Sequence, residues 1–326
     1  MSEPYAFILR QTGGPDVLEA EHGDSPRPGT GEVLVRHEAV GLNFIDTYHR
    51  SGLYALPLPS GLGSEAAGVI EAVGDGVSGF REGDRVGYFT GPLGAYATHR
   101  AIAADRLVKL PDTLCAEDAA AIMLKGCTAE YLVERCAKVV AGETVLVFAA
   151  AGGVGSILVP WLKHVGATVI AHAGDSRKAE QASALGADHA LWAPFDGLAA
   201  EVRALTGGKG VPVVLDGVGA ASWKASLGAV ARRGLIVSYG NASGPVPPFT
   251  ALDLLTAGSI FVTRPTLGDY VPDAEEMRRS AARLFELVEK GVVPVRIGAR
   301  FPLLKAAEAH RAIEARQTTG STVLIP

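Results

Sequence analysis

The chain has 326 residues, 48% of them hydrophobic, and a formal net charge of -5. Acidic and basic residues are mixed along its length, so we expect no basic face for nucleic-acid phosphates. The first residues do not have the basic segment followed by an apolar segment that is typical of a signal peptide. No apolar run approaches the roughly 18 residues of a membrane-spanning helix. The composition therefore predicts a cytoplasmic protein, large enough for two domains, with neither nucleic acid nor a membrane as its main partner.

Cysteine and histidine are sparse, and neither follows a metal-binding or disulfide pattern. The three cysteines, Cys115, Cys127 and Cys136, are 12 and 9 residues apart and include no C-x-x-C pair. The eight histidines show no H-x-x-x-H or comparable spacing. We expect reduced thiols in small apolar positions, because an odd and scattered set of cysteines does not make a disulfide framework.

The first part of the chain, residues 1 to about 125, is rich in short alternating strands. Runs such as 32–41, 68–74 and 84–89 are separated by turns of glycine, proline and aspartate. Strands at this spacing predict a compact barrel-like or sandwich domain. A helical stretch from about Glu117 to Val140 follows, where alanine and leucine replace the turn residues.

From residue 143 the pattern changes to apolar strands that alternate with helices. The expected strands are 143–150, 168–174, 188–192, 212–218, 234–240 and 259–264. The expected helices between them are 153–167, 178–185, 198–205, 223–230 and 252–256. Six strands in this alternation predict a doubly wound parallel sheet, and Pro160 predicts a kink in the first helix.

The tail from about Gly268 contains an amphipathic helix over 274–290 and then short strand signals up to 322–326. It has no sheet unit of its own, so we expect it to return and complete the first domain. The predicted organisation is an α/β chain in two domains. One domain is made of residues 1–125 and 268–326, and the other of residues 126–267.

The segment AAAGGVGS, residues 149–156, lies between the first expected strand and the first expected helix of the second domain. The dinucleotide fingerprint G-x-G-x-x-G falls on Ala150, Gly152 and Gly155, so its first glycine is replaced. A pyrophosphate sits at this place on helix N–H groups and the positive end of the helix dipole. The position of the loop therefore predicts dinucleotide binding, provided that Ala150 needs no positive φ.

The end of the second expected strand distinguishes the two nicotinamide cofactors. An NAD-selective sheet usually carries Asp or Glu there to bind the ribose hydroxyls, whereas this strand ends in Ala-Gly at 173–174. Asp175 follows and would repel a phosphate, but Ser176, Arg177 and Lys178 come next. A hydroxyl and two cations can bind a 2′-phosphate, so the segment predicts NADPH over NADH.

Ordered motifs along the chain resemble those of one known family. They are NFIDTYHRSGLY (43–54), PSGLGSEAAGVIEAVG (59–74), LKGCTAEYL (124–132), AAAGGVG (149–155), VSYGNASG (237–244), VTRP (262–265) and GSTVLIP (320–326). Together they resemble the zinc-independent medium-chain dehydrogenases/reductases, most closely the NADPH:quinone oxidoreductases related to ζ-crystallin. The resemblance implies a GroES-like, β-rich substrate domain made from both chain ends, with an inserted Rossmann domain that binds NADPH.

The resemblance also implies a reaction without a metal. Zinc-dependent relatives carry a G-H-E segment whose histidine binds the catalytic zinc, and the matching residues here are Gly63, Ser64 and Glu65. Serine does not replace histidine in a zinc site of cysteine and histidine, and the region 43–46 lacks the cysteine of the zinc enzymes. Without a Lewis acid, quinone reduction is favoured over alcohol oxidation, because a quinone accepts hydride readily.

Four residues are implied to orient the substrate, with no obligatory acid or base: Asn43, Tyr48, Tyr54 and Arg264. Asn43 can hydrogen-bond the ribose or the acceptor. The two tyrosines offer hydroxyls and flat faces to a quinone, and ordinary aromatic packing is the alternative. Arg264 can contact the acceptor or the cofactor phosphates, or form a surface ion pair.

The implied cofactor positions lie at the ends of the expected strands, in the 43–48 segment and in the tail. They are Phe44, Ile45, Asp46, Thr47, Tyr131, Gly152, Gly153, Val154, Gly155, Gly174, Ser176, Arg177, Lys178, Gly240, Asn241, Ala242, Ser243, Val262, Thr263, Arg264 and Arg316. Asp46 can equally serve only to fix a neighbouring loop. Bacterial members tend to have tyrosine where this chain has Ala193, and the sequence leaves open whether Trp192 replaces its ring.

These features predict an NADPH-dependent quinone reductase that moves hydride from nicotinamide C4 to a quinone. Two alternatives remain: an enone or enoyl-thioester reductase on the same scaffold, with Tyr48 or Tyr54 as proton donor, and a non-catalytic NADPH-binding protein of the crystallin kind.

The segment 259–265 would be an apolar strand at the edge of the sheet, and such an edge must be paired or covered. Because family members commonly join two subunits at this edge, we expect a homodimer with a two-fold axis.

Overall fold

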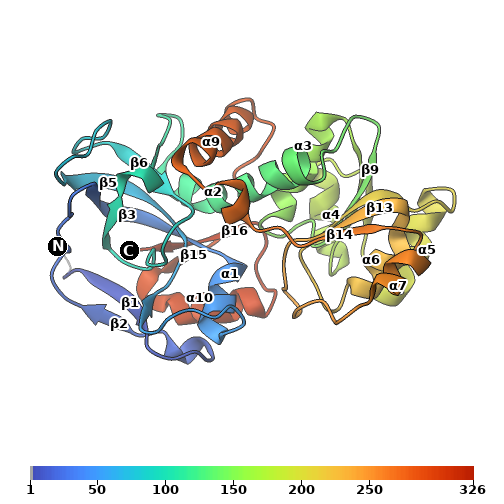
Figure 1. The fold of residues 1–326 in the computed structure, drawn as a ribbon, viewed down its shortest axis with the longest axis horizontal. Helices are drawn as coiled ribbons and strands as arrows, with labels where there is room; N and C mark the ends of the chain where they lie inside the picture. The colour runs from blue at the N-terminus through green and yellow to red at the C-terminus, as the bar shows by residue number, and fades with distance from the viewer. Residues whose placement is uncertain (1–2) are drawn as a thin grey trace. The chain divides into compact units, whose positions relative to one another are not determined.

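The computed structural model describes residues 3–326, which belong to two compact units. Unit 1 takes in Met1–Lys125, Val271–Glu289 and Val295–Pro326. Unit 2 takes in Gly126–Tyr270 and Lys290–Pro294. The β-structure of the two units is separate, because no strand of one is hydrogen-bonded to a strand of the other among the described residues (Figure 1).

The main sheet of unit 1 joins both ends of the chain. Its strands in spatial order are β15 (Ile297–Pro302), β16 (Ser321–Ile325), β3 (Glu32–Leu42), β5 (Glu65–Val73), β6 (Arg85–Tyr88) and β8 (Val108–Lys109), and β7 (His99–Ala103) pairs with β3. A smaller sheet has the order β2 (Ala20–His22), β1 (Tyr5–Leu9) and β4 (Ser60–Gly61). β16 runs antiparallel to β3, with Leu324 opposite Val40. The C-terminal tail therefore returns to pair with the N-terminal segment.

Three helices and three 3-10 turns accompany these sheets. They are α1 (Phe44–Ser51), α9 (Ala274–Glu289), α10 (Ala306–Glu314), η1 (Pro15–Val17), η2 (Ala104–Arg106) and η4 (Leu303–Lys305). One hydrophobic core holds Val33 and Val35 of β3 together with Leu303, Ala306 and Ile313 of the tail. Burial of apolar side chains from both chain ends in one cluster stabilises their association.

Unit 2 is built on a six-stranded parallel sheet. Its strands are β9 (Thr144–Val147), β10 (Thr168–His172), β11 (His189–Leu191), β12 (Val211–Asp216), β13 (Val230–Ser238) and β14 (Phe261–Thr263). The spatial order is β11-β10-β9-β12-β13-β14, and all neighbouring pairs are parallel. Numbered within the unit this is 3-2-1-4-5-6, the order of a doubly wound nucleotide-binding sheet. The predicted α/β fold class is confirmed.

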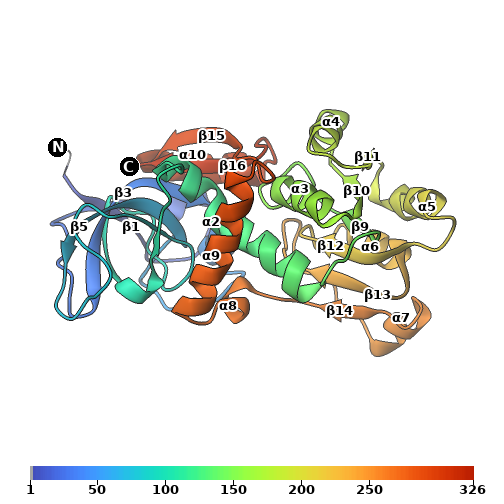
Figure 2. The same cartoon turned by 90° about the horizontal axis from the view of Figure 1, so that it is seen from above.

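Helices cover both faces of this sheet. They are α3 (Gly155–Val165), α4 (Ser176–Ala184), α5 (Phe195–Leu205), α6 (Trp223–Ala229) and α7 (Ala251–Thr256), with a short α8 (Leu267–Tyr270). Leu198 of α5 and Trp223 of α6 pack in one cluster with Leu146 and Ile236 of the sheet. α3 lies on the other side of the sheet from α5 and α6 (Figure 2), as right-handed crossovers in opposite directions require.

The helix predicted over 117–140 ends earlier as a regular α-helix, and the helix that contains Pro160 lies close to its predicted range. The helix predicted over 117–140 is α2 (Ala116–Glu130) followed by a π-helical stretch, η3 (Tyr131–Cys136). α3 is assigned as one helix through Pro160, which lacks the N–H that would bond to the carbonyl of residue 156.

Helix α10 is not predicted by the sequence analysis, which assigns only short strands to that part of the tail. Its buried positions are Ala306, Ala309, His310 and Ile313, at helical spacing. Two alanines and a histidine give little hydrophobic contrast, so the periodicity is weak in the sequence alone.

Candidate functional site

The glycine loop of unit 2 joins β9 to the N-terminus of α3. A Cβ added to Gly155 would lie 2.3 Å from the carbonyl oxygen of Ala149, so only glycine fits there. The left-handed conformation falls on Ala149, with φ 50°, and Ala150 has no positive φ. Ala150 can therefore occupy the first glycine position of the fingerprint, because its backbone does not need a positive φ. Instead Ala150 is fully buried and donates its N–H to His172 of the neighbouring strand at 3.0 Å.

The start of α3 has the properties of an anion site. The first N–H groups of a helix have no intrahelical acceptor, and the helix dipole is positive at this end. Ser156 Oγ donates to the Gly153 carbonyl at 3.0 Å, which ties the last residues of the loop to the first turn. A close glycine turn before a helix N-terminus fits a pyrophosphate.

The turn after β10 carries the predicted phosphate-binding residues. Asp175 caps α4, and its Oδ1 accepts from the N–H of Lys178 at 2.8 Å. Lys178 Nζ lies 3.9 Å from Asp175 Oδ2, so one carboxylate partly balances this ammonium. Ser176 and Arg177 are exposed, and a Cβ on Gly174 would meet nothing within 4 Å. The turn offers a hydroxyl, two cations and open space to a ligand phosphate.

His172 fixes the neighbouring loop on the predicted adenine side. Its Nε2 donates to the Ala193 carbonyl at 2.9 Å in the tautomer that this bond requires. The ring lies between Phe148 and Phe195, at centroid distances of 5.5 and 5.1 Å. Burial lowers the pKa of His172, which keeps the ring neutral in this apolar setting. The adjacent Trp192 is 60% exposed, so its indole is available to a planar ligand.

The predicted cofactor loop at 240–243 is tied to the turn after β12. Ser243 Oγ donates to the Val218 carbonyl at 2.8 Å and accepts from the N–H of Ala221 at 2.9 Å. A Cβ on Gly240 would lie 2.5 Å from the carbonyl oxygen of Gly217. The two turns therefore hold each other at the carboxyl end of the parallel sheet, where such sheets bind ligands.

Tyr131 lies at the start of the π-helical stretch and stacks on Tyr270. The ring centroids are 4.4 Å apart with 15° between the planes, and the Arg135 guanidinium lies 5.4 Å from the Tyr270 centroid. Burial, and then the Cys136 thiol, raise the pKa of Tyr270 to about 12. Arg264, after β14, is exposed and donates to the Pro265 carbonyl at 2.7 Å.

In unit 1, Asn43 precedes α1 and is 3% exposed. Its backbone N–H donates to Asp46 Oδ2 at 2.9 Å. Its side-chain Nδ2 donates to Glu65 Oε2 at 2.8 Å and to the Gly41 carbonyl at 3.3 Å. Because both partners are acceptors, they fix the orientation of the amide. The side-chain nitrogen of Asn43 therefore donates to acceptors of the protein itself. The side-chain oxygen Oδ1 of Asn43 can only accept hydrogen bonds.

Asp46 is a fully buried carboxyl group in the first turn of α1. Its Oδ2 also accepts from the Tyr96 hydroxyl at 3.1 Å, while Oδ1 has no hydrogen-bond partner among the described residues. Burial raises its pKa to about 7, against the lowering effect of the donors from Asn43 and Tyr96. These bonds indicate that Asp46 stabilises the first turn of α1, in which it lies.

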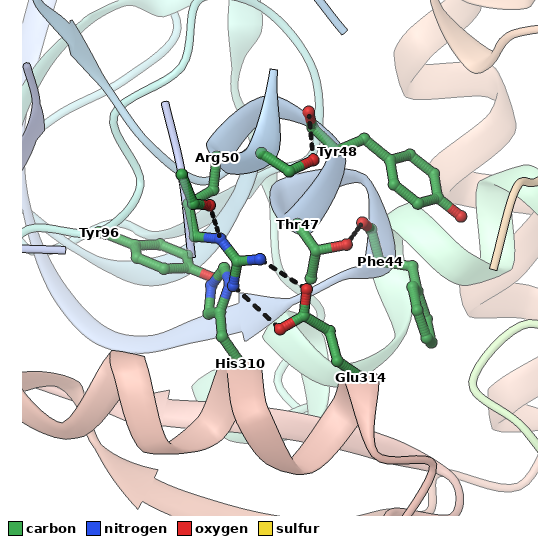
Figure 3. Close-up of polar contacts among 9 residues, drawn as sticks. Phe44, Thr47, Tyr48, Arg50, Tyr96, His310 and Glu314 are labelled. Atoms are coloured by element: carbon green, nitrogen blue, oxygen red, sulfur yellow. Dashed lines mark hydrogen bonds and ion pairs between the residues drawn. The ribbon is translucent and has the colours of Figure 1, made fainter. Parts of the chain in front are cut away.

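A chain of hydrogen bonds continues from Asp46 to α10, and Figure 3 shows its members Arg50, Tyr96, His310 and Glu314. Arg50 donates to His310 Nδ1 at 3.3 Å, so His310 carries its proton on Nε2 and donates to the Tyr96 hydroxyl at 2.9 Å. Tyr96 in turn donates to Asp46. Burial and then Arg50 lower the pKa of His310 to about 3. Arg50 also makes two bonds to Glu314, at 2.5 and 3.1 Å, and the whole chain fixes both ends of α1.

The aromatic residues of α1 lie on another side of the helix from Arg50. Figure 3 shows the phenol of Tyr48 extending away from the Arg50–Glu314 pair. Tyr48 is 8% exposed, with ring centroids 5.2 Å from Tyr54 and 6.2 Å from Phe44. The three rings form one aromatic group at the predicted substrate segment.

Three more predicted positions are placed as follows. Thr47 Oγ1 donates to the Phe44 carbonyl at 2.7 Å, which uses the hydroxyl within the helix. Ile45 is half-buried in the same helix. Arg316, after α10, is exposed and adopts φ 57°.

The residues present do not fit a zinc ion. Among residues 3–326 no group of three or more His, Cys, Asp or Glu side chains is placed to hold a metal. Ser64 stands where zinc enzymes have histidine, and the adjacent Glu65 instead accepts from Leu124 N at 2.7 Å and from Asn43. Lys125 Nζ lies 3.7 Å from Glu65 Oε2, so a cation of the chain itself faces this carboxylate.

The sequence analysis missed most of this supporting network. Arg50 lies in α1, Tyr96 in the loop before β7 and His310 in α10, and Lys125 lies at the boundary of unit 1. No local spacing joins them, because the partners in this network are up to 264 residues apart. The one available signal is chemical, namely that charged residues occur within apolar or alternating segments, where a buried partner is required.

Family models match two segments of the chain. One, described as an alcohol dehydrogenase GroES-like domain, matches residues 29–112. The other, described as a zinc-binding dehydrogenase, matches residues 153–286. The first lies in unit 1, and the second covers most of the parallel sheet of unit 2. No helix among the described residues is both long and apolar enough to cross a membrane.

Individual proteins match nearly the whole chain. A quinone oxidoreductase of Pseudomonas aeruginosa is 50% identical, over 96% of this chain and 97% of that protein. A 2-haloacrylate reductase of a Burkholderia species is 43% identical, over 98% of each. The solved structure of Escherichia coli quinone oxidoreductase complexed with NADPH matches with a TM-score of 0.95 and 42% identity, over 99% of this chain and 100% of that chain.

Proposed function

Because this chain belongs to the quinone oxidoreductase family of zinc-independent medium-chain dehydrogenases/reductases, we propose that it reduces a quinone with NADPH. The observation that carries the proposal is 50% identity to a quinone oxidoreductase over 96% of the chain. Unit 2 has the parallel sheet and glycine loop of a dinucleotide-binding domain. We assign residues 126–267 to the NADPH domain and residues 1–125 with 268–326 to the substrate domain.

The residues of unit 2 fit NADPH. The glycine cradle at 152–155 and the N-terminus of α3 would hold the pyrophosphate. Ser176, Arg177 and Lys178 would hold the 2′-phosphate through a hydroxyl and two cations. Gly174, Tyr131 and the residues of 240–243 and 262–264 complete the proposed contacts. When bound, NADPH supplies a hydride from nicotinamide C4.

The residues of unit 1 would orient the acceptor. Asn43 offers Oδ1 to a hydroxyl of the ligand, because its Nδ2 is committed to Glu65 and Gly41. Phe44, Tyr48 and Tyr54 would give a quinone ring an apolar and aromatic surface. Their support by Asp46 and Arg50 favours a fixed orientation, which lowers the barrier by holding reacting groups in position.

Steady-state kinetics test this proposal. We expect NADPH oxidation on addition of 1,4-benzoquinone, with one hydroquinone formed for each NADPH consumed. NADPH binding without turnover of any quinone or activated alkene would contradict the proposal and support a non-catalytic NADPH-binding protein. The cofactor proposal itself fails if NADH and NADPH give equal kinetics.

The activity is proposed to need no metal. The donor set around Ser64 and Glu65 supports this, because serine and one buried glutamate do not make a zinc site. We expect prolonged treatment with a chelator to leave the rate unchanged. Loss of turnover that added zinc restores would contradict it.

Reduction of an activated C=C bond is the second candidate. It is favoured by the 2-haloacrylate reductase relative, which is 43% identical over 98% of the chain. Such a reaction uses the same hydride and needs a proton donor near the α carbon, and the hydroxyls of Tyr48 and Tyr54 are the candidates for this role. Comparing kcat/KM for 1,4-benzoquinone and for an enone, each with NADPH, ranks the two activities.

We also propose a homodimer in the cytoplasm. β14 is an outer strand of the sheet of unit 2, and Phe261 on it is 64% exposed. Leu252 and Leu255 of α7 are 69% and 62% exposed, so the same unit presents further apolar surface. Light scattering at micromolar concentration should give twice the chain mass, and a monomer would contradict this proposal.

The cytoplasmic location is supported by three cysteines that are present as thiols.

A further inference from the structure

A buried ammonium group near Asn43 has no hydrogen-bond acceptor. The side chain of Lys125 is 6% exposed, and its Nζ makes no hydrogen bond among the residues that the structure describes. Glu65 Oε2 lies 3.7 Å away, which is an ion-pair distance but too long for a hydrogen bond. An ammonium has three N–H donors, and burying donors without acceptors costs free energy.

Glu65 does not explain these unused donors. Its two oxygens already accept from Leu124 N at 2.7 Å and from Asn43 Nδ2 at 2.8 Å. Burial raises the pKa of Glu65, and Lys125 opposes that rise. The pair thus accounts for the charge of Lys125 but leaves its N–H groups available to a ligand oxygen.

Asn43 cannot supply the same donor. Its Nδ2 is held by Glu65 and Gly41, so the amide presents only an acceptor. An acceptor that takes up hydride develops negative charge on an oxygen, and a placed donor stabilises that charge. Within the group formed by Asn43, Glu65 and Lys125, the ammonium is the donor that remains.

We propose that Lys125 is a catalytic residue that donates to the acceptor oxygen, an assignment that rests on the proposed quinone reduction. Bound NADPH would supply a hydride from nicotinamide C4, that is two electrons and one proton, to the quinone and would leave as NADP⁺. The quinone thereby gains two electrons and becomes the hydroquinone anion, with its charge on an oxygen. That oxygen takes a proton from Lys125 Nζ to give the neutral hydroquinone, and the amine regains a proton from water.

Two substitutions at this position separate donation from cofactor binding. Lys125→Met removes the donor at similar length, and Lys125→Gln keeps a neutral N–H. We expect kcat with 1,4-benzoquinone to fall about 100-fold in the first, the lower end of the range for a general acid, and about 10-fold in the second, where a hydrogen bond remains. The dissociation constant of NADPH, from nicotinamide fluorescence, should stay within about twofold. Lys109→Met is the matched control, because Lys109 pairs with Asp84 at 2.8 Å on the surface.

A purely structural role predicts different results. If Lys125 only neutralises Glu65, the double variant Lys125→Met/Glu65→Gln regains kcat, which would overturn the proposal. Donation predicts that kcat stays low in the double variant, even where its thermal midpoint recovers. A rise in the NADPH dissociation constant with unchanged kcat would also overturn it, since Lys125 would then bind the cofactor. If Lys125→Met does not fold, the kcat of Lys125→Gln decides in the same way.

Quinone turnover by the unmodified protein separates this inference from its premise. Absence of NADPH–quinone turnover in the unmodified protein counts against the proposed function. Normal turnover in both Lys125 variants counts against Lys125 alone.

Discussion

The two halves of the molecule carry candidate binding regions that are built in different ways. In unit 2 the nucleotide loops consist of backbone, glycines and exposed polar residues, and Ser156–Gly153 and Lys178–Asp175 are only three residues apart. In unit 1 the substrate segment rests on buried ionisable side chains, and Arg50 and His310 are 260 residues apart. One half is therefore local and the other depends on distant parts of the chain.

The difference has a physical basis in what each half is proposed to bind. A pyrophosphate is held by N–H groups that every helix N-terminus offers, so the main requirement is close approach of the backbone. A reacting acceptor needs side chains held at fixed positions, and buried hydrogen-bonded charges supply that rigidity at a desolvation cost. Substitutions in the two halves should consequently fail in different ways.

The largest expected effect on ligand affinity is on the glycine loop. In Gly155→Val the new Cβ would lie 2.3 Å from the Ala149 carbonyl oxygen and 2.7 Å from Ala150 Cα, so the turn cannot keep its shape. We expect NADPH affinity to fall at least about 100-fold, which corresponds to roughly 2.7 kcal/mol. Fluorescence titration with NADPH measures this.

The matched control for the loop is Gly197→Ala in α5, where a new Cβ meets nothing within 4 Å. This variant should bind NADPH as the unmodified protein does. Near-normal affinity of Gly155→Val would show that the loop is not the phosphate site.

The next effect concerns Arg50, which is 3% exposed and bonded to Gly13, His310 and Glu314. Arg50→Met leaves the buried His310 ring and the partly exposed Glu314 carboxylate without their donor, and we expect about 3 kcal/mol of destabilisation, the lower end of the range for a broken buried pair. Urea unfolding followed by circular dichroism measures it. All three tryptophans lie in unit 2, so their fluorescence should change less if the two units unfold separately.

Arg311→Met is the control for Arg50. Arg311 is also on the tail helix α10 but pairs with Asp16 at the surface, with both side chains well exposed. An exposed pair of this kind is worth less than about 1 kcal/mol. Equal destabilisation by the two substitutions would mean that the buried network of unit 1 contributes no more to the free energy of unfolding than an exposed ion pair does.

A smaller effect is expected at the turn of unit 2 that we propose to bind the 2′-phosphate. Lys178→Ala removes one charge-assisted bond, worth about 1.5–3 kcal/mol. The KM for NADPH should rise about tenfold or more, while that for NADH barely changes. Lys209→Ala, at an exposed turn of the same unit, is the control. An equal rise of both KM values would remove Lys178 from phosphate recognition.

The smallest effect is a change in pH dependence. Burial raises the pKa of Asp46 from 3.8 to about 7, so the folded state holds its proton more tightly than the unfolded state. The contribution of Asp46 to the free energy of unfolding is fully present below about pH 4 and is lost as the pH rises to about 7. The pKa of His310 is lowered from 6.5 to about 3, so its contribution is lost as the pH falls through that window.

The two contributions therefore oppose each other between pH 4 and pH 6.5. In Asp46→Asn the opposing term is removed, and the free energy of unfolding should fall more steeply on acidification from pH 7 to pH 4. Urea unfolding at several pH values measures the slope. Parallel curves for the variant and the unmodified protein would contradict the raised pKa of Asp46.

The sequence alone predicted the parallel sheet correctly, and it placed the glycine loop between the first strand and the first helix of that sheet. Apolar strands in alternation with helices favour one sheet order, and the position of AAAGGVG between β9 and α3 marks where a phosphate would bind. These features depend on residues that are near neighbours in the chain, so periodicity and turn chemistry are sufficient to find them. The strand ends differ by a few residues, because hydrogen bonding at strand ends depends on the neighbouring strand.

Only the tertiary structure decided how Asn43 and α1 are supported. Whether Ala150 is tolerated depended on the backbone, which puts the positive φ on Ala149 instead. Helix α10 gives a weak pattern, yet it brings His310 and Glu314 to Arg50. Burial within unit 1, and not residue type, sets the pKa of Asp46 and leaves Lys125 with unused donors. Such properties arise from desolvation and from partners distant in sequence, and no local pattern carries them.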